Sequence, residues 1–208
     1  APCRRPVVGI IGGMGPEATV DLMRRVIAAT PARDDADHIH LLVDSNPAVP
    51  SRIAALIDET GPSPLPELVR MAKGLEAGGA TMLAMPCNTA HFYAGEIADA
   101  VGLPLIDMVA LTADHLAKTA PAQAKVGLLA STAVLKIGLY KRALEDRGLD
   151  IVIPHRQDDV MAIIRAVKAG EGGSGQRERL AEIAADLKDS GAGMILVACT
   201  ELSILADG

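Results

Sequence analysis

Short apolar runs alternate along the chain with longer stretches in which apolar residues recur every three to four positions. The runs have the length and composition of buried strands, and the longer stretches have the spacing of amphipathic helices. Strands that alternate with helices are typical of parallel sheets covered by helices, so the pattern predicts an α/β fold. The predicted strands begin near residues 7, 39, 80, 103, 125, 151 and 192.

The second half of the chain repeats the pattern of the first half. Residues 80–87 and 192–199 are both apolar runs that end in a cysteine, and residues 8–14 correspond to residues 126–132. In each copy a strand, a turn and a helix come first, and the strand with the cysteine comes last. The chain therefore contains two versions of one supersecondary arrangement.

Two such copies predict two similar lobes, residues 1–103 and 104–208, each a parallel sheet flanked by helices. We expect a pseudo-twofold to relate the lobes and the functional site to lie in the interlobe cleft. Equivalent strand ends would then face each other across the cleft. Cys87 and Cys199 would stand on its opposite walls.

Two cysteines at matching strand ends have several possible roles. They could form a disulfide, contribute to a zinc site or simply fill the core, although the chain has neither Cys-x-x-Cys spacing nor a paired-histidine motif, and we expect no metal. A fourth role uses the symmetry. A helix N-terminus favours a thiolate, and two thiols on opposite faces of one carbon can remove a proton and return it from the other side. That chemistry is racemisation or epimerisation without a cofactor.

Polar loops follow the other strands of the first lobe. The glycine-rich turn at residues 12–16 either brings backbone N–H groups toward an anion or only turns the chain into a helix. Arg52 ends the loop after the second strand. Ligands of open parallel sheets bind at this edge, so Arg52 is a candidate for holding a carboxylate.

Composition and charge exclude some classes of function. The net charge of −6, with no tryptophan and one phenylalanine, gives neither the basic surface nor the stacking residues of a nucleic-acid-binding protein. The apolar segments are too short and interrupted to span a membrane. The three cysteines are scattered, and no basic stretch followed by a long apolar run opens the sequence, so we expect a cytoplasmic protein.

Four motifs together resemble the aspartate/glutamate racemase superfamily, specifically its aspartate racemase branch. They are Gly-Gly-Met-Gly-Pro-Glu-Ala-Thr at 12–19, Asn-Pro-x-x-Pro-x-Arg at 46–52, Pro-Cys-Asn-Thr-Ala-His at 86–91 and Ala-Cys-Thr-Glu-Leu at 198–202. The resemblance covers nearly the whole chain. Glutamate racemases have Asp-Ser-Gly and Cys-Thr-His where this chain has Gly-Gly-Met and Cys-Thr-Glu, which favours the aspartate branch.

The resemblance implies an isomerase that uses no pyridoxal phosphate or other cofactor, with Cys87 and Cys199 as the alternating base and acid. It also implies a small acidic amino-acid substrate, most simply aspartate, and a homodimer. Arg52 and Lys168 would hold the carboxylates of this substrate. The other residues implied to line the cleft are Met14, Asn88, Thr89, Ser131, Thr132 and Thr200.

Other functions share these features. Hydantoin racemases and maleate cis-trans isomerases resemble the same two-lobed, two-cysteine plan, but a neutral hydantoin does not need two cationic contacts such as Arg52 and Lys168. A non-catalytic two-lobed protein that binds acidic metabolites is the alternative from another class. In that case the thiols would be incidental to function.

Overall fold

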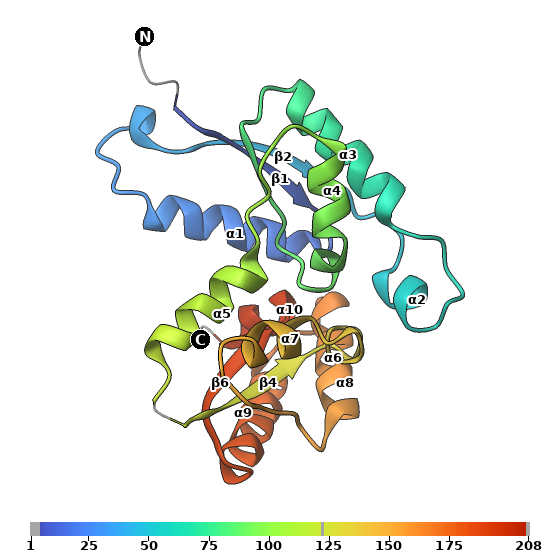
Figure 1. Ribbon diagram of the computed structural model, residues 1–208, viewed down its shortest axis with the longest axis vertical. Helices are drawn as coiled ribbons and strands as arrows, with labels where there is room; N and C mark the ends of the chain where they lie inside the picture. Colours follow the sequence, from blue (N-terminus) through green and yellow to red (C-terminus); the bar gives the residue numbers. More distant parts are fainter. Residues whose placement is uncertain (1–4, 122, 207–208) are drawn as a thin grey trace. The chain divides into compact units, whose positions relative to one another are not determined.

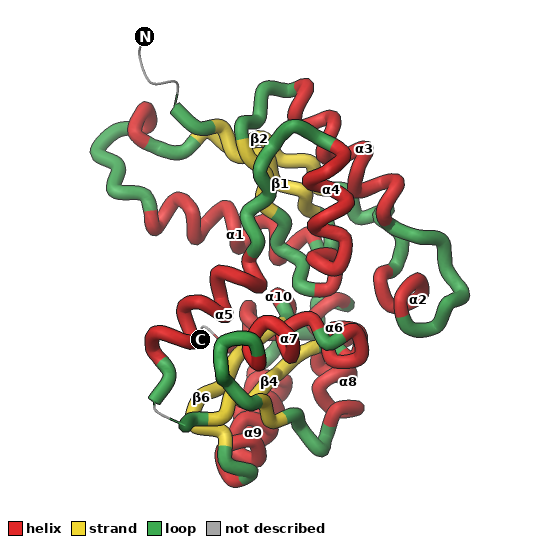
Figure 2. Tube along the Cα trace, in the orientation of Figure 1, coloured by secondary structure: helices red, strands yellow, loops and turns green. Residues whose placement is uncertain are grey.

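The computed structural model describes residues 5–121 and 123–206, which form two compact units divided between Asp107 and Met108. Each unit is a three-stranded parallel sheet flanked by helices, as the ribbon in Figure 1 and the strands in Figure 2 show. The predicted α/β fold with two similar parallel-sheet lobes is confirmed. Within the described ranges, no helix is long and apolar enough to cross a membrane.

The sheet of the first unit has the order β2-β1-β3. Its strands are β1 (Val7–Gly12), β2 (His40–Ser45) and β3 (Met82–Ala84). The helices are α1 (Pro16–Ala29), η1 (Asp35–Asp37), α2 (Arg52–Leu56), α3 (Leu65–Ala77), η2 (Thr89–Tyr93) and α4 (Ala94–Ala100). Figure 1 shows α1 on one face of this sheet and α3 with α4 on the other.

The core of the first unit lies between the sheet and α3. Leu68, Met71 and Leu75, three to four residues apart, form the buried face of this helix, as its spacing predicts. The helix lies close to β1 because Gly9 has no side chain: a Cβ there would stand 3.1 Å from the Cβ of Leu75. Ile11 and Leu83 are fully buried in the same core cluster as these helix residues.

The first unit reaches Asp107 rather than the predicted residue 103, because the segment around Leu105 belongs to its sheet region. Leu83 and Leu105 form an isolated parallel bridge. The N–H of Leu83 donates to the carbonyl of Pro104 at 2.8 Å, and the N–H of Ile106 donates to the carbonyl of Leu83 at 2.8 Å. This segment therefore extends the sheet beyond β3.

The sheet of the second unit has the matching order β5-β4-β6. Its strands are β4 (Lys125–Ala130), β5 (Ile151–Val152) and β6 (Ala192–Ala198). The helices are α5 (Met108–Thr119), α6 (Thr132–Ile137), α7 (Leu139–Glu145), α8 (Gln157–Lys168), α9 (Ser174–Asp189) and α10 (Thr200–Ala206). Figure 1 shows α5 and α7 on one face and α8 and α9 on the other.

Two predicted helices are interrupted. The apolar spacing of residues 90–101 predicts one helix, but the structure has a 3-10 turn, η2, followed by the α-helix α4. The spacing that follows the strand at residue 125 predicts one helix to about Arg147. The structure divides it into α6 and α7 at Gly138, whose φ of 66° is left-handed and ends the first helix. Apolar spacing continues across both breaks, so it could not show them.

Candidate active site

The predicted site residues of the first unit share one edge of its sheet. Met14 follows β1, Arg52 lies beyond β2, and Cys87 follows β3. Asn88 and Thr89 come directly after the cysteine, and Thr89 is the first residue of η2. The strands run parallel, so all of these loops leave the carboxyl edge, where α/β sheets bind ligands.

The loop that carries Cys87 is held by His91. Both side chains are buried, and Nδ1 of His91 lies 2.9 Å from the carbonyl oxygen of Cys87. A carbonyl only accepts, so Nδ1 is the protonated ring nitrogen in this contact. The N–H of Cys87 donates to the carbonyl of Met85 at 2.9 Å. His91 therefore supports the backbone of the cysteine loop.

The glycine-rich turn is packed against the loop after β2. Gly13 has a φ of 89°, and a Cβ there would lie 2.4 Å from backbone atoms of Asn46. The N–H of Asn46 donates to the carbonyl of Gly12 at 3.3 Å, and the N–H of Gly13 donates to Oγ1 of Thr19 at 2.8 Å. The close approach of the two loops explains why position 13 is glycine. The same contacts hold the backbone beside the buried Met14.

Arg52 lies at the start of a short helix, α2, whose N-cap is Ser51. Oγ of Ser51 accepts from the N–H of Ala54 at 3.2 Å. The Arg52 guanidinium donates to the carbonyl oxygens of Pro50, at 3.1 Å, and Val49, at 3.4 Å. These contacts use one of its two terminal nitrogens and hold the side chain against its own loop. The guanidinium keeps further donors for a ligand.

The predicted residues of the second unit lie at the carboxyl ends of β4 and β6. Ser131 is the N-cap of α6 and accepts from the N–H of Val134 at 3.3 Å, and Thr132 begins that helix. Cys199 directly follows β6, and Thr200 begins α10. The two strands are neighbours, so these four residues share one edge of the sheet, as in the first unit.

Sequence reasoning missed Gln157, which connects this edge to α8. Its Nε2 donates to the carbonyl of Ala130 at 2.9 Å and to Oγ1 of Thr132 at 3.3 Å. From the same helix, Sδ of Met161 accepts from the N–H of Thr132 at 3.3 Å. No motif marks Gln157, because its contacts depend on how α8 packs against the end of β4.

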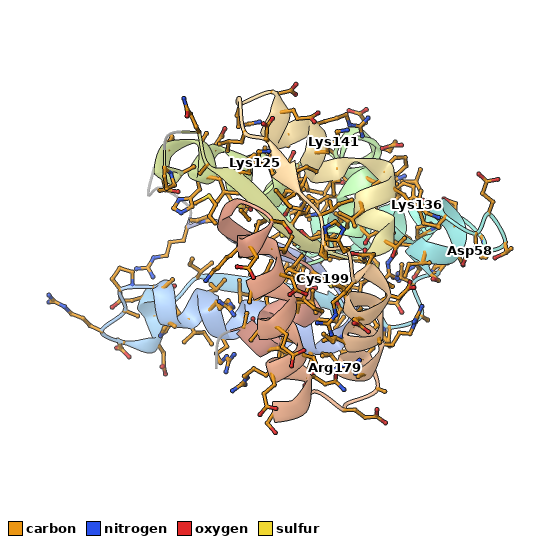
Figure 3. All side chains as sticks on the ribbon, turned by 90° about the horizontal axis from the view of Figure 1, so that it is seen from below. Asp58, Lys125, Lys136, Lys141, Arg179 and Cys199 are labelled. Atoms are coloured by element: carbon orange, nitrogen blue, oxygen red, sulfur yellow. The ribbon has the colours of Figure 1, made fainter. Side chains whose placement is uncertain are left out.

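Cys199 has an acidic neighbour, Glu201, which in the sequence served only to distinguish the aspartate branch from the glutamate branch. The Cys199 Sγ lies 3.2 Å from Oε2 of Glu201, and Oγ1 of Thr200 lies 3.4 Å from the same oxygen. Nζ of Lys168 stands 3.6 Å from Oε1 of Glu201. Cys199 and Glu201 are buried, whereas the Lys168 side chain is 45% exposed. Figure 3 shows Cys199 among other side chains in this part of the chain.

The protein raises the pKa of Cys199 well above its ordinary value of 9.0. Burial is the first cause, and the charge and hydrogen bond of the Glu201 carboxylate add to it. Backbone N–H groups of Leu202 and Glu201 in α10 act in the opposite direction but are outweighed. The start of the helix therefore favours the Cys199 thiolate as expected, but burial and the neighbouring carboxylate have the larger effect, and the net result favours the thiol.

Cys87 and Cys199 are free thiols in this structure. Among residues 5–121 and 123–206, no group of three histidine, cysteine or acidic side chains is arranged to hold a metal ion.

A surface groove of about 460 Å³ in the second unit has none of the predicted site residues in its lining, which includes Lys125, Lys141 and Ile153. Lys125 and Lys141 are labelled in Figure 3.

The sequence profile of the Asp/Glu/hydantoin racemase family matches residues 11–208. The chain belongs to this family. It is 27% identical over 206 residues to the broad specificity amino-acid racemase RacX of Bacillus subtilis, with 97% of this chain and 88% of that protein covered. The family assignment supports a racemase, which is an isomerase.

Solved structures support the same assignment. The aspartate racemase of Picrophilus torridus is 33% identical, with a TM-score of 0.87, and the match covers 96% of this chain and 83% of that one. The glutamate racemase of Francisella tularensis, solved with D-glutamate, shares the fold at 16% identity and a TM-score of 0.65, over 98% of this chain and 71% of that one. The racemase fold predicted from the four motifs is confirmed.

Proposed function

We propose that this racemase interconverts L- and D-aspartate by 1,1-proton transfer without pyridoxal phosphate, with Cys87 and Cys199 as the two acid/base groups. The observation that carries the proposal is the equivalence of the two cysteine strands. β3 and β6 each lie beside the first strand of their sheet, and each is followed by a buried free thiol at the carboxyl edge. Two equivalent groups suit a reaction whose substrate and product are mirror images.

In the proposed reaction one cysteine, as thiolate, takes the α-proton of aspartate, and the other, as thiol, gives its proton to the opposite face of the same carbon. The α-carbon is a weak acid, so the charge that develops on the carboxylate must meet preorganised donors. Asn88, Thr89 and Thr200, next to the cysteines in sequence, are proposed to supply such donors. Ser131, Thr132 and Met14 are proposed to line the site with them.

Arg52 is proposed to bind a substrate carboxylate, since its guanidinium has donors beyond those given to its own loop. Lys168 is proposed as a second contact. Its ammonium already faces Glu201, but the side chain is partly exposed and can serve a substrate as well. Two cations suit a dicarboxylate substrate, and the similarity to the Picrophilus torridus aspartate racemase supports aspartate in particular.

The direct test is to incubate the dialysed protein with L-aspartate in D₂O, with no added cofactor. D-aspartate should form, and deuterium should replace the α-proton. Cys87→Ser and Cys199→Ser should each reduce racemisation by several orders of magnitude, because one acid/base group cannot serve both faces of the carbon. Activity that appears only with added pyridoxal phosphate, or full activity in either variant, would contradict the mechanism.

Substrate specificity is tested by comparing the turnover of aspartate, glutamate, neutral amino acids and a hydantoin. The relative RacX has broad specificity, and one methylene of difference changes binding by only about 1–3 kcal/mol. We therefore expect slower turnover of glutamate beside that of aspartate, and none of a neutral hydantoin. If neutral amino acids are racemised as fast as aspartate, the proposed roles of Arg52 and Lys168 are wrong.

A further inference from the structure

Cys87 and Cys199 follow equivalent strands but differ in the residue two positions later, which is Thr89 in the first unit and Glu201 in the second. A carboxylate beside a thiol affects which form of the thiol is stable. The second unit therefore has an electrostatic group at its cysteine that the same position of the first unit cannot provide. This difference makes the two acid/base groups unequal before any substrate binds.

Glu201 is buried together with its partners. Its residue exposure is 7%, that of Cys199 is 6%, and Oε2 accepts hydrogen bonds from the thiol and from Oγ1 of Thr200. Oε1 is also buried and, among the described residues, has no hydrogen-bond partner, but the Lys168 ammonium stands 3.6 Å away. A buried carboxylate is costly unless a cation and hydrogen-bond donors accompany it, and here both are present.

The packing of α10 limits which charges act on this pair. The helix packs against β6, α8 and α9. Cys199, at the end of β6, and Lys168, on α8, contribute the groups that contact Glu201. In the described part of the chain, no α9 side chain forms an ion pair or hydrogen bond with Glu201, and α9 buries the apolar Leu180, Ile183 and Leu187. The thiol, the carboxylate and the ammonium therefore form one group of three.

The net charge of the three side chains favours the protonated form of the Cys199 thiol. With Cys199 as thiol, Glu201 as carboxylate and Lys168 as ammonium, the group is neutral. If the thiol lost its proton to solvent, two buried negative groups would stand 3.2 Å apart, with one partly exposed cation 3.6 Å from the carboxylate. Like charges at this distance disfavour that state. The arrangement therefore binds one proton firmly.

We propose that Glu201 keeps Cys199 as the neutral thiol in the resting enzyme, so that Cys199 begins the reaction as the proton donor, and that Lys168 limits the strength of this effect. Glu201 is thus a positioning residue that acts through Cys199. The consequence for direction rests on the proposed function: Cys87 starts as the base and acts on the enantiomer whose α-proton faces it. The protonation of Cys199 itself does not depend on that function.

The test measures the alkylation of Cys199 by iodoacetamide as a function of pH, without substrate. Only the thiolate reacts, so the pH midpoint reports the pKa, and the plateau rate at high pH reports access to the sulfur. Peptide mass spectrometry separates Cys199 from the other cysteines. Cys87 in the same samples is the reference for reagent and quenching.

Glu201→Gln keeps the shape and an acceptor oxygen but removes the charge. It should lower the pH midpoint, so that below it Cys199 reacts about tenfold faster or more, since one unit of pKa is a tenfold change in thiolate. Glu201→Asp should restore the midpoint toward that of the wild type. Glu178→Gln, which removes an exposed charge from α9, is the matched control and should leave the midpoint unchanged.

Lys168→Met removes the cation that neutralises Glu201 and should raise the midpoint, with slower alkylation of Cys199 at a given pH. This opposite shift tests the proposal even if Glu201→Gln does not fold. An unchanged or higher midpoint in folded Glu201→Gln would overturn it, and so would an unchanged or lower midpoint in Lys168→Met. A change in plateau rate alone would show altered access and would also count against it.

The outcomes separate this inference from the proposed function. If the midpoints shift as expected but aspartate is not racemised, the role of Glu201 stands and the proposed function fails. If aspartate is racemised but the midpoints do not move, the proposed function stands and the role of Glu201 fails.

Discussion

At the residue scale, the Asn46 backbone determines what can occupy position 13. The left-handed φ of Gly13 disfavours any side chain, and the neighbouring loop leaves no room for a Cβ. The sequence shows a glycine-rich turn at this place, which is compatible with anion binding or with a plain turn. The structure adds the physical reason for the glycine, which is contact between the loops after β1 and β2.

Gly13→Ala should therefore destabilise the first unit by at least about 1–3 kcal/mol, the range for strained backbone, with a further cost from the overlap with Asn46. Gly74→Ala is the matched control: Gly74 lies in α3, and a Cβ there meets nothing within 4 Å. Alanine in a helix interior should stabilise by about 0.5–1 kcal/mol. Urea unfolding measures both, and equal effects of the same sign would contradict this explanation.

At the element scale, a charged cluster joins α3 to the loop after β2. Arg70 donates to both carboxylate oxygens of Glu67, at 2.7–3.0 Å, and Nδ2 of Asn46 donates to Oε1 of Glu67 at 2.5 Å. Asp44 lies 3.7 Å from the Arg70 guanidinium. Because Asn46 also contacts the glycine-rich turn, this cluster helps to hold the loop that leads to Arg52.

The hydrogen bonds and charge of Arg70 hold the pKa of Glu67 below its ordinary value of 4.5, and Asn46 adds a further hydrogen bond. A lowered pKa means that the folded state binds the proton less well than the unfolded state does. The stabilisation by Glu67 is therefore complete above about pH 4.5 and is lost as the pH falls through the lower folded value.

Glu67→Gln should make the urea midpoint of the first unit less sensitive to acid: the variant should be less stable than the wild type at pH 7, and the difference should shrink as the pH falls below 4.5. The effect is small, because the Arg70 side chain is largely exposed and Glu67 is only partly buried. Arg70→Gln should show the same pH dependence, and the double variant should add little to either change. A difference that stays constant from pH 7 to pH 3 would exclude the ionised pair as its cause.

At the scale of the whole molecule, each unit has a core of its own. Leu83 belongs to the buried cluster of the first unit, together with Leu68 and Met71, and Leu128 belongs to that of the second, together with Tyr140 and Leu144. The two leucines are fully buried in β3 and β4. Separate cores allow separate unfolding transitions.

Leu83→Ala should lower the stability of the first unit by about 2–5 kcal/mol, and Leu128→Ala should do the same for the second, because each leaves a cavity that the surroundings fill only in part. Hydrogen exchange with peptide resolution should show loss of protection confined to residues 5–107 in one variant and to residues 108–206 in the other. Loss spread equally over both units in either variant would mean that the chain unfolds as one cooperative body.

The sequence by itself determined the elements and their pairing into two similar units. Apolar runs and helical spacing depend on local composition, and the repetition of a strand that ends in Cys87 or Cys199 showed that the halves are alike. The family motifs added the racemase fold, which is confirmed. Breaks such as Gly138 were not evident, because apolar spacing continues through them.

Only the tertiary structure decided which side chains meet. Lys168 and Glu201 lie far apart in sequence and come together because α8 packs against α10, and Gln157 reaches Ala130 for a similar reason. The pKa of Cys199 depends on burial and on the distance to a carboxylate, neither of which a residue pattern contains. Local patterns fix backbone conformation, whereas the electrostatics of a thiol are set by neighbours that packing brings close.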